Sequence, residues 1–210
     1  MKLKNEDVVK FSKINYFENP YKYCQITEVF SQEVADSLLN WLESIEFTKK
    51  EEEFYRNSWF NISSEVLPDN LKLVFSHKNL KKIKSNVEKI FGVTFTEDML
   101  IFGQKYEPGE GTLIHTDYME PTNRNYQYFF THRMIVYLNH GWEEKQGGLF
   151  GVFSSSDPKD IISTFEPIHN TAVSLSHGPS SYHAVSSVNE GIRYAIQFSF
   201  LSKELKYEGE

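Results

Sequence analysis

The sequence predicts a mainly β protein in which N-terminal helices buttress a C-terminal double-stranded β-helix, or jelly roll. Two observations lead to this class. Two amphipathic helical patterns precede residue 97, and from there on short β-prone segments alternate with turn residues. Many short strands divided by Gly, Pro and Asn turns are typical of a barrel or jelly roll rather than of a parallel α/β sheet.

The two helices are expected at residues 31–45 and 77–92. The apolar stripe of the first helix consists of Val34, Leu38, Leu42 and Ile45. The stripe of the second consists of Leu80, Ile83, Val87 and Ile90. Ser31 is a suitable N-cap for the first helix, and Gly92 is a suitable end for the second. Spacing of three and four residues places each stripe on one helical face.

The strands are expected in the second half of the chain. The β-prone segments are residues 99–106, 111–117, 132–139, 148–153, 170–176, 182–188 and 192–200. We find no internal repeat, low-complexity tract or linker, so one domain over residues 1–210 is expected. Within it, residues 1–96 form a helical and mixed support region, and residues 97–203 form the jelly-roll core.

Composition narrows the class of protein. The chain has 210 residues and a net charge of −7, which disfavours nucleic acid as the main partner because phosphate binding needs basic surfaces. Its densest basic segment is KNLKKIK at 78–84, and its single cysteine, Cys24, excludes an internal disulfide. No apolar run approaches the roughly 18 residues of a membrane span, and residues 1–11 lack a secretory signal. We expect a cytoplasmic protein without a membrane partner, whereas its oligomeric state is unknown.

The segment GTLIHTD (111–117) places His115 and Asp117 two residues apart. Because side chains alternate along a strand, both would point to the same side. A His-x-Asp pair by itself is common, and it also fits an ordinary surface strand end. If another imidazole joins it, the resulting facial triad of two histidines and a carboxylate leaves open positions on Fe(II) for a co-substrate and oxygen.

The third ligand must come from elsewhere in the chain. His132 and His140 flank an apolar run, and His169 follows Pro167 in an expected turn. His183 and His177 are therefore the serious candidates. We favour His183, because a hairpin through residues 188–191 would pair its strand with that of Arg193. His177 is the alternative.

Arg193 begins an alternating segment, IRYAIQFSF. One face carries Tyr194, Ile196, Phe198 and Phe200, and the other carries Arg193, Ala195, Gln197 and Ser199. The polar face could lie in water, as in a half-buried strand, or inside the barrel around a charged ligand. Spacing alone does not decide between these two arrangements.

Taken together, these segments resemble the prolyl 4-hydroxylase-like branch of the Fe(II)/2-oxoglutarate-dependent oxygenases. QKYEPGEGTLIHTD (104–117) resembles the family's Tyr, turn and His-x-Asp stretch. RMIVYLNHGWEEKQGGLFGVF (133–153) resembles its Tyr-Leu-Asn, Trp and Gly-Gly signature. PIHNTAVSLSHGPSSYHAV (167–185) and GIRYAIQFSF (191–200) resemble its His-x-Val and closing Gly-x-Arg segments. The resemblance rests on the order of these pieces over residues 100–201, since no single piece is specific.

The resemblance implies a role for each matching residue. His115, Asp117 and His183 would ligate iron, and Arg193 would bind the distal carboxylate of 2-oxoglutarate. Tyr106 and Tyr137 would line the co-substrate pocket, although ordinary core packing would equally explain them. The three residues with an architectural role would be Trp142, Gly147 and Gly148. The implied cofactors are Fe(II), 2-oxoglutarate and O2, with ascorbate as a supporting reductant.

The implied fold is a cupin-like jelly roll, and the implied reaction is hydroxylation of an unactivated C–H bond with release of succinate and CO2. Because Asp117 is present, halogenation is disfavoured, whereas desaturation and ring formation stay open. The expected substrate is an amino acid, free or within a peptide, protein or natural product. The alternatives are a nucleic-acid-oxidising oxygenase of the same superfamily and a non-enzymatic jelly-roll binding module.

The segment 118–130 is long for a connection and rich in Tyr and Phe. Long loops of this kind often cover a substrate. The competing interpretation is a loop whose aromatic side chains plug one end of the barrel. If the loop covers the substrate, shortening it would raise KM and spare iron binding.

Overall fold

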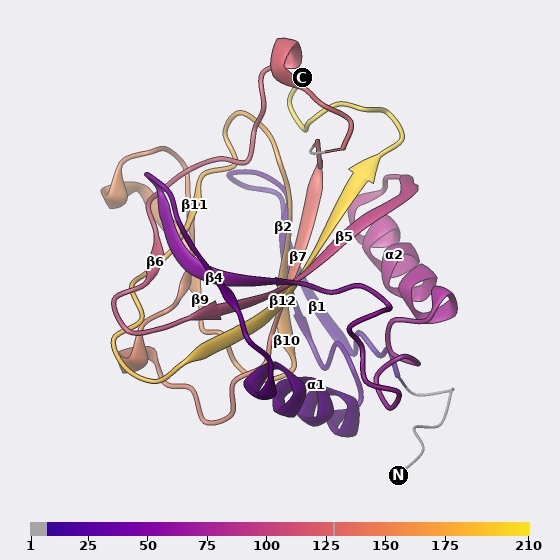
Figure 1. Cartoon of the computed structure of the whole chain (residues 1–210). Coiled ribbons are helices and arrows are strands. Elements are labelled where there is room, and N and C mark those ends of the chain that lie inside the picture. The colour runs from indigo at the N-terminus through magenta and orange to yellow at the C-terminus, as the bar shows by residue number, and fades with distance from the viewer. Residues whose placement is uncertain (1–7, 128) are drawn as a thin grey trace.

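A twisted nine-stranded antiparallel sheet forms the centre of the computed structural model, which describes residues 8–127 and 129–210 (Figure 1). Most of the N-terminal segment 1–11 and one residue of the loop 118–130 therefore lie outside the described residues. The strands of the first half are β1 (Lys13–Phe17), β2 (Tyr23–Thr27), β3 (Thr48–Glu51), β4 (Tyr55–Asn61), β5 (Phe95–Tyr106) and β6 (Gly111–Thr112). Those of the second half are β7 (His132–Tyr137), β8 (Phe150–Phe153), β9 (Ile161–Phe165), β10 (Thr171–Ser176), β11 (His183–Val185) and β12 (Arg193–Ser202).

Two sheets make up the jelly roll. The large sheet has the order β1-β2-β10-β7-β12-β5-β4-β3, with β6 paired to β4. The small sheet has the order β11-β8-β9. The predicted fold class, mainly β with a double-stranded β-helix, is confirmed.

The helices are α1 (Gln32–Ser44) and α2 (His77–Phe91), as the two apolar stripes predict. Ser31 occupies the N-cap position of α1, although its side chain makes no capping hydrogen bond. Gly92 ends α2 in the left-handed conformation, with φ of 67°. Within the described residues, no helix is long and apolar enough to cross a membrane.

Alternate residues of the central strands supply two separate cores. On β7, Met134 and Val136 join the cluster that packs under the helices, whereas Ile135 and Tyr137 face the small sheet. Both faces of the large sheet are therefore buried, one by α1 and α2 and the other by β8, β9 and β11 (Figure 1). The interior of the jelly roll lies between the two sheets.

The strands β1 to β4 and β9 were not predicted from the sequence. β3 (TKKE) is fully exposed and has no apolar residue, and β1 (KINYF) is largely exposed and only five residues long. β4 (YRNSWFN) carries buried polar residues, Asn57 and Ser58, instead of an apolar face. Patterns based on hydrophobicity miss strands of both kinds.

The expected hairpin between residues 182–188 and 192–200 is wrong. β11 pairs with β8 in the small sheet, whereas β12 lies between β5 and β7 in the large sheet. The turn carries the chain from one sheet to the other, and Val188 forms a bridge with Gly147 on the way. Arg193 and His183 still line the same cavity, because they face each other across the barrel rather than along a hairpin.

His132 is buried at the start of β7 between the rings of Phe91 and Phe95, with Nδ1 2.9 Å from the Thr131 hydroxyl. Burial, with small contributions from His177 and Lys22, lowers its pKa from the ordinary 6.5 to about 3. Between these values the unfolded chain binds a proton that the folded protein does not, so stability rises with pH over this range.

We therefore expect His132→Gln to flatten this dependence. Between pH 7.5 and 5.5 the wild type should lose on the order of 1 kcal/mol more unfolding free energy than the variant. Urea unfolding at both pH values measures this difference. An equal loss in the two proteins would contradict a neutral, buried His132.

Candidate active site

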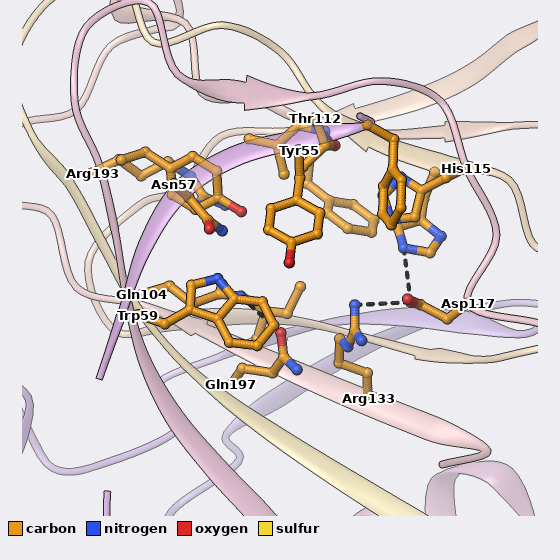
Figure 2. Close-up of a pocket in the computed structure, with 16 residues that line it drawn as sticks. Tyr55, Asn57, Trp59, Gln104, Thr112, His115, Asp117, Arg133, Arg193 and Gln197 are labelled. Carbon is orange, nitrogen blue, oxygen red and sulfur yellow. Dashed lines mark hydrogen bonds and ion pairs between the residues drawn. The ribbon is translucent and has the colours of Figure 1, made fainter. Parts of the chain in front are cut away.

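A cavity of about 210 Å³ opens between the two sheets (Figure 2). Its walls come from β4, β5, β7 and β12 of the large sheet, from residues 112–117, and from β8 and β11 of the small sheet. The charged residues in its lining are Asp117, Arg133 and Arg193. Of the predicted site residues, His115, Asp117, His183, Arg193 and Tyr106 all line it.

A backbone bridge holds His115 beside His183. Each residue donates its N–H to the carbonyl of the other, at 3.0 and 2.9 Å, and the two rings lie 4.5 Å apart. Close approach of the two segments also requires Gly111, since a Cβ there would lie 2.7 Å from the Val185 carbonyl oxygen. Two histidines that are 68 positions apart in the sequence are thereby set in register.

Both imidazoles have a defined orientation. Nδ1 of His115 lies 2.8 Å from the Leu113 carbonyl oxygen, and Nδ1 of His183 lies 2.8 Å from that of Ser181. A proton on each Nδ1 leaves the Nε2 lone pair free for a metal. Burial, followed by the neighbouring His183, lowers the pKa of His115 to about 4, so this ring is neutral at neutral pH.

Asp117 completes the cluster. Its Oδ2 lies 3.1 Å from Nε2 of His183 and 2.8 Å from Nη1 of Arg133. Burial opposes ionisation, but Arg133, His177 and His183 together hold the pKa of this carboxyl well below its usual range. One ligand atom from each of His115, Asp117 and His183 lies within 4.8 Å of the others.

His177, the alternative third ligand, lies behind Asp117. It is buried, with Nδ1 3.1 Å from the Phe130 carbonyl oxygen and Nε2 3.4 Å from Oδ2 of Asp117. Burial lowers its pKa to about 3. His177 does not line the cavity, so it lies behind the carboxylate as a buried neighbour rather than meeting a ligand.

Arg193 lies inside the barrel, so the polar face of β12 is an interior face. Its side chain is fully buried, and Nε donates to the Gly148 carbonyl at 2.9 Å. Nη1 and Nη2 have no hydrogen-bond partner among the residues that the structure describes. A buried guanidinium with two unpaired donor groups in a cavity is suited to bind a carboxylate bidentately.

Two tyrosines flank this guanidinium. The ring centres of Tyr106 and Tyr137 lie 4.8 and 4.9 Å from Cζ of Arg193, which allows cation–π attraction to both. The strand register explains the arrangement, since Arg193 is paired with Tyr106 on β5. Tyr106 lines the cavity, whereas Tyr137 is fully buried; burial raises the pKa of its hydroxyl, and the neighbouring Arg193 opposes this rise.

Trp142, Gly147 and Gly148 shape the seat of Arg193. The indole N–H of Trp142 donates to the Gly147 carbonyl at 3.0 Å. A Cβ on Gly148 would lie 2.8 Å from Cδ of Arg193, and φ at Gly148 is +64°. The architectural role expected for these residues thus has a concrete form: they position the arginine.

Several cavity residues were not predicted from the sequence, namely Tyr55, Asn57, Trp59, Gln104, Arg133 and Gln197. Tyr55, Asn57 and Trp59 alternate along β4 and point into the cavity (Figure 2). Gln197 belongs to the polar face of β12 and accepts a hydrogen bond from Gln104 at 2.8 Å. The alternation of polar and apolar residues along β12 was the sequence signal that could have identified Gln197 as a cavity residue.

The loop 118–130 packs on the C-terminal segment. Tyr118, Met119, Phe129 and Phe130 form a cluster with Leu201 and Tyr207, and none of the described loop residues lines the cavity. Arg124 lies over the rings of Phe129 and Tyr207, 4.8 Å from each, and pairs with Glu210. These contacts favour the structural interpretation of the loop aromatics over that of a substrate cover.

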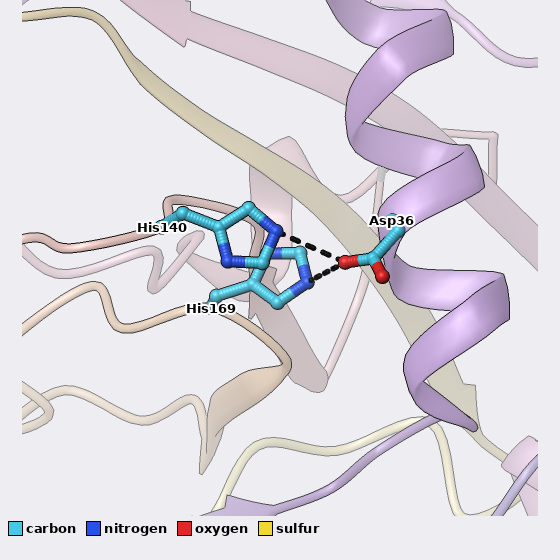
Figure 3. Close-up of side chains that lie close together, drawn as sticks. All are labelled: Asp36, His140 and His169. Atoms are coloured by element: carbon cyan, nitrogen blue, oxygen red, sulfur yellow. Dashed lines mark hydrogen bonds and ion pairs between the residues drawn. The ribbon is translucent and has the colours of Figure 1, made fainter.

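A second cluster, Asp36 with His140 and His169, lies outside the cavity (Figure 3). Nε2 of each histidine lies about 3 Å from Oδ1 of Asp36, at 2.9 and 3.0 Å, and the rings stack with centres 3.7 Å apart. Asp36 and His140 are exposed to a large degree, with side-chain exposures of 42% and 56%. The cluster connects α1 to the segments after β7 and β9.

The cavity residues fit a divalent metal and a dicarboxylate. Among the described residues, Nε2 of His183 and both terminal nitrogens of Arg193 are buried without a hydrogen-bond partner. Buried polar atoms normally have partners, and such orphans indicate an unfilled binding role. Two imidazoles and one carboxylate are the donor set of non-haem Fe(II) sites.

The fold and this donor set define a class, the non-haem iron oxygenases built on a jelly roll. Residues 101–200 match the family model of the 2OG-Fe(II) oxygenase superfamily. This match covers just under half of the chain and, together with the fold, supports a 2-oxoglutarate- and iron-dependent dioxygenase, with a fold similar to that of the prolyl 4-hydroxylases. Its cofactors are Fe(II), 2-oxoglutarate and O2.

Solved structures show the same fold at low sequence identity. A prolyl 4-hydroxylase from Pseudomonas putida superposes with a TM-score of 0.66 and 16% identity, over 85% of this chain and 91% of that one. A Trichoplax adhaerens prolyl hydroxylase, solved in complex with a peptide fragment of the hypoxia inducible factor oxygen degradation domain, gives 0.62 and 14%, over 87% and 84%. The viral collagen prolyl hydroxylase of Paramecium bursaria Chlorella virus-1, solved with 2-oxoglutarate, gives 0.60 and 15%, over 85% and 94%.

The seat of Arg193 can be tested at Gly148. In Gly148→Ala the added methyl group would displace the guanidinium, so 2-oxoglutarate affinity should fall about 10-fold or more, with metal affinity unchanged. The matched control is Gly141→Ala, because Gly141 has a similar φ of +63° and no atom within 4 Å of its Cβ position. Calorimetric titration of Mn(II) into the metal-free proteins measures the metal affinity. Titration of 2-oxoglutarate into the Mn(II)-loaded proteins measures the co-substrate affinity. Equal losses in the two variants would show that backbone strain, and not the arginine, is responsible.

Proposed function

We propose that the protein hydroxylates an unactivated C–H bond of an amino acid, free or within a peptide, protein or natural product. In the balanced reaction, 2-oxoglutarate, O2 and R–H give succinate, CO2 and R–OH. The observation that carries the proposal is the joint placement of the His-Asp-His cluster and the unpaired Arg193 in one cavity. The fold similarity to prolyl hydroxylases supports an amino-acid residue as the substrate.

In this proposal His115, Asp117 and His183 hold the metal, and Arg193 binds the distal carboxylate of 2-oxoglutarate. Tyr106 and Tyr137 keep the guanidinium in place from both sides. Ferrous iron, when bound, supplies the redox chemistry that links decarboxylation of 2-oxoglutarate to oxidation of the substrate. The protein contributes fixed ligands, an anchored co-substrate and a cavity between the two sheets.

We further propose that residues 97–203 act as the catalytic jelly-roll core and residues 1–96 as its support. The helices bury the outer face of the large sheet. The support region also reaches the site, because β4 contributes Tyr55, Asn57 and Trp59 to the cavity wall. Truncation before residue 97 would therefore remove one side of the active site.

The reaction is tested with purified protein, Fe(II), ascorbate, O2 and 2-oxoglutarate. A substrate should stimulate succinate formation and gain one oxygen atom, which mass spectrometry detects. Loss of two hydrogens without added oxygen would indicate desaturation or ring formation instead. Failure of the metal-loaded protein to bind 2-oxoglutarate would refute the proposal.

The ligand set is tested by comparing two histidines. His183→Ala removes a proposed ligand, so Mn(II) affinity should fall by more than about 100-fold, whereas His177→Ala removes only a support of Asp117 and should cost about 10-fold. Electron paramagnetic resonance of free Mn(II) measures both affinities, and circular dichroism checks folding. His77→Ala, at the exposed start of α2, should bind like the wild type. The opposite ranking of the first two variants would make His177 the ligand.

A further inference from the structure

Arg133 is a second guanidinium in the cavity, and the proposed chemistry gives it no ligand. It lies on β7, and its Nη1 contacts Oδ2 of Asp117 at 2.8 Å (Figure 2). Its Nε is buried without a hydrogen-bond partner, although the side chain as a whole is one-fifth exposed. The contact with Asp117 therefore uses only part of its donor capacity.

The charges of the cavity do not balance once iron and 2-oxoglutarate are present. The two positive charges of Fe(II) offset the two negative charges of 2-oxoglutarate. Among the lining residues, Asp117 offsets one arginine, which leaves the other without a counter-charge. An unpaired charge in a poorly solvated site is costly, so a bound anion would be strongly favoured there. Arg193 would be occupied by the co-substrate, and Asp117 would share its charge between the metal and Arg133, so Arg133 is the arginine whose charge is incompletely offset.

Neighbouring polar groups would complete a small polar subsite. The amide of Gln197 is held in place by Gln104 and by Ser199, to whose hydroxyl it donates at 3.0 Å. The indole N–H of Trp59 is buried without a partner. Figure 2 shows Trp59 and Gln197 on the same side of the cavity as Arg133. A ligand carboxylate near Arg133 could also accept a hydrogen bond from this indole.

We propose that Arg133 binds a carboxylate of the substrate itself. This inference rests on the proposed function, and it narrows the substrate to an amino acid whose own α-carboxylate is free, or to another small acid. The carboxylate would lie beside Asp117 and hence beside the metal, so the oxidised C–H bond lies close to the acid group. A residue inside a peptide chain lacks such a group.

Two sources could supply the carboxylate, namely a free amino acid and the C-terminal residue of a peptide. A second cavity of about 340 Å³ adjoins the first and shares Phe54, Tyr55, Thr112 and Val185 with it. It offers room for the residues that precede a C-terminal one. The first cavity, of about 210 Å³, must also hold the metal and 2-oxoglutarate, so it leaves room for only a small part of a substrate in either case.

The test uses full-length protein saturated with Mn(II) and 2-oxoglutarate. Thermal shift and calorimetry screen the free amino acids, their amides, and short peptides with free or amidated C-termini. Acids should bind about 10- to 100-fold more tightly than the matching amides, because the amide lacks the charge-assisted hydrogen bonds. Binding of free amino acids alone, or of peptides with a free C-terminus, identifies the source.

Variants of Arg133 test whether this residue causes the preference for acids over amides. Arg133→Met should abolish the difference between acid and amide, and Arg133→Lys should keep part of it, with 2-oxoglutarate still binding to both. Lys72→Met removes a surface charge paired with Asp69 and should behave like the wild type. Equal binding of acids and amides, no acid-dependent binding at all, or a preference that survives Arg133→Met would overturn the inference. Loss of 2-oxoglutarate binding in the wild type would instead overturn the proposed function.

Discussion

The pair of backbone hydrogen bonds between His115 and His183 is the constraint on which the site depends. It joins the segment after β6 to the start of β11 and fixes two imidazoles in register. Asp117 follows two residues later and meets His183 at 3.1 Å. Gly111 permits this approach, because any side chain there would collide with the backbone of β11. Because main-chain atoms make this bridge, the two histidines are brought together whenever the two sheets assemble correctly.

Burial of charge is the second constraint. The barrel interior holds Arg193 and Asp117, and burial of either without a partner would destabilise the fold. Asp117 is stabilised by Arg133 and His177, and Arg193 by two tyrosine rings and the Gly148 carbonyl. The apolar contacts of α1 and α2 with the other face of the large sheet supply compensating stability. The terminal nitrogens of Arg193 stay unpaired, and this leaves them available to a ligand.

Sequence patterns predicted the parts of the fold that carry a hydrophobic period. α1, α2 and the alternation in β12 belong to this group. The order of the His-x-Asp, Tyr-Leu-Asn and Gly-x-Arg segments likewise indicated His115, Asp117, His183 and Arg193, which the fold brings into one cavity. The error over the hairpin arose because local turn signals do not distinguish a return within a sheet from a crossing between sheets.

The cavity residues of β4, and Arg133 on β7, could not be predicted from a hydrophobic period or from the order of the motifs. The cavity face of β4 carries Asn57 between Tyr55 and Trp59, so it shows no regular apolar period, and the partner strand β5 follows more than 30 residues later. Arg133 lies within an apolar strand, where a single arginine gives no period at all. Arg133 can be recognised as a cavity residue only once the folded barrel places it beside Asp117.

The central claim is that one cavity binds a metal through the His-Asp-His cluster and a dicarboxylate through Arg193. Calorimetric titration of 2-oxoglutarate into metal-free and Mn(II)-loaded protein, each as wild type and as Arg193→Met, tests it most directly. Tight binding is expected only when both the metal and Arg193 are present, because the two ends of 2-oxoglutarate would be held separately. Binding that is independent of the metal, or unchanged in Arg193→Met, would contradict it.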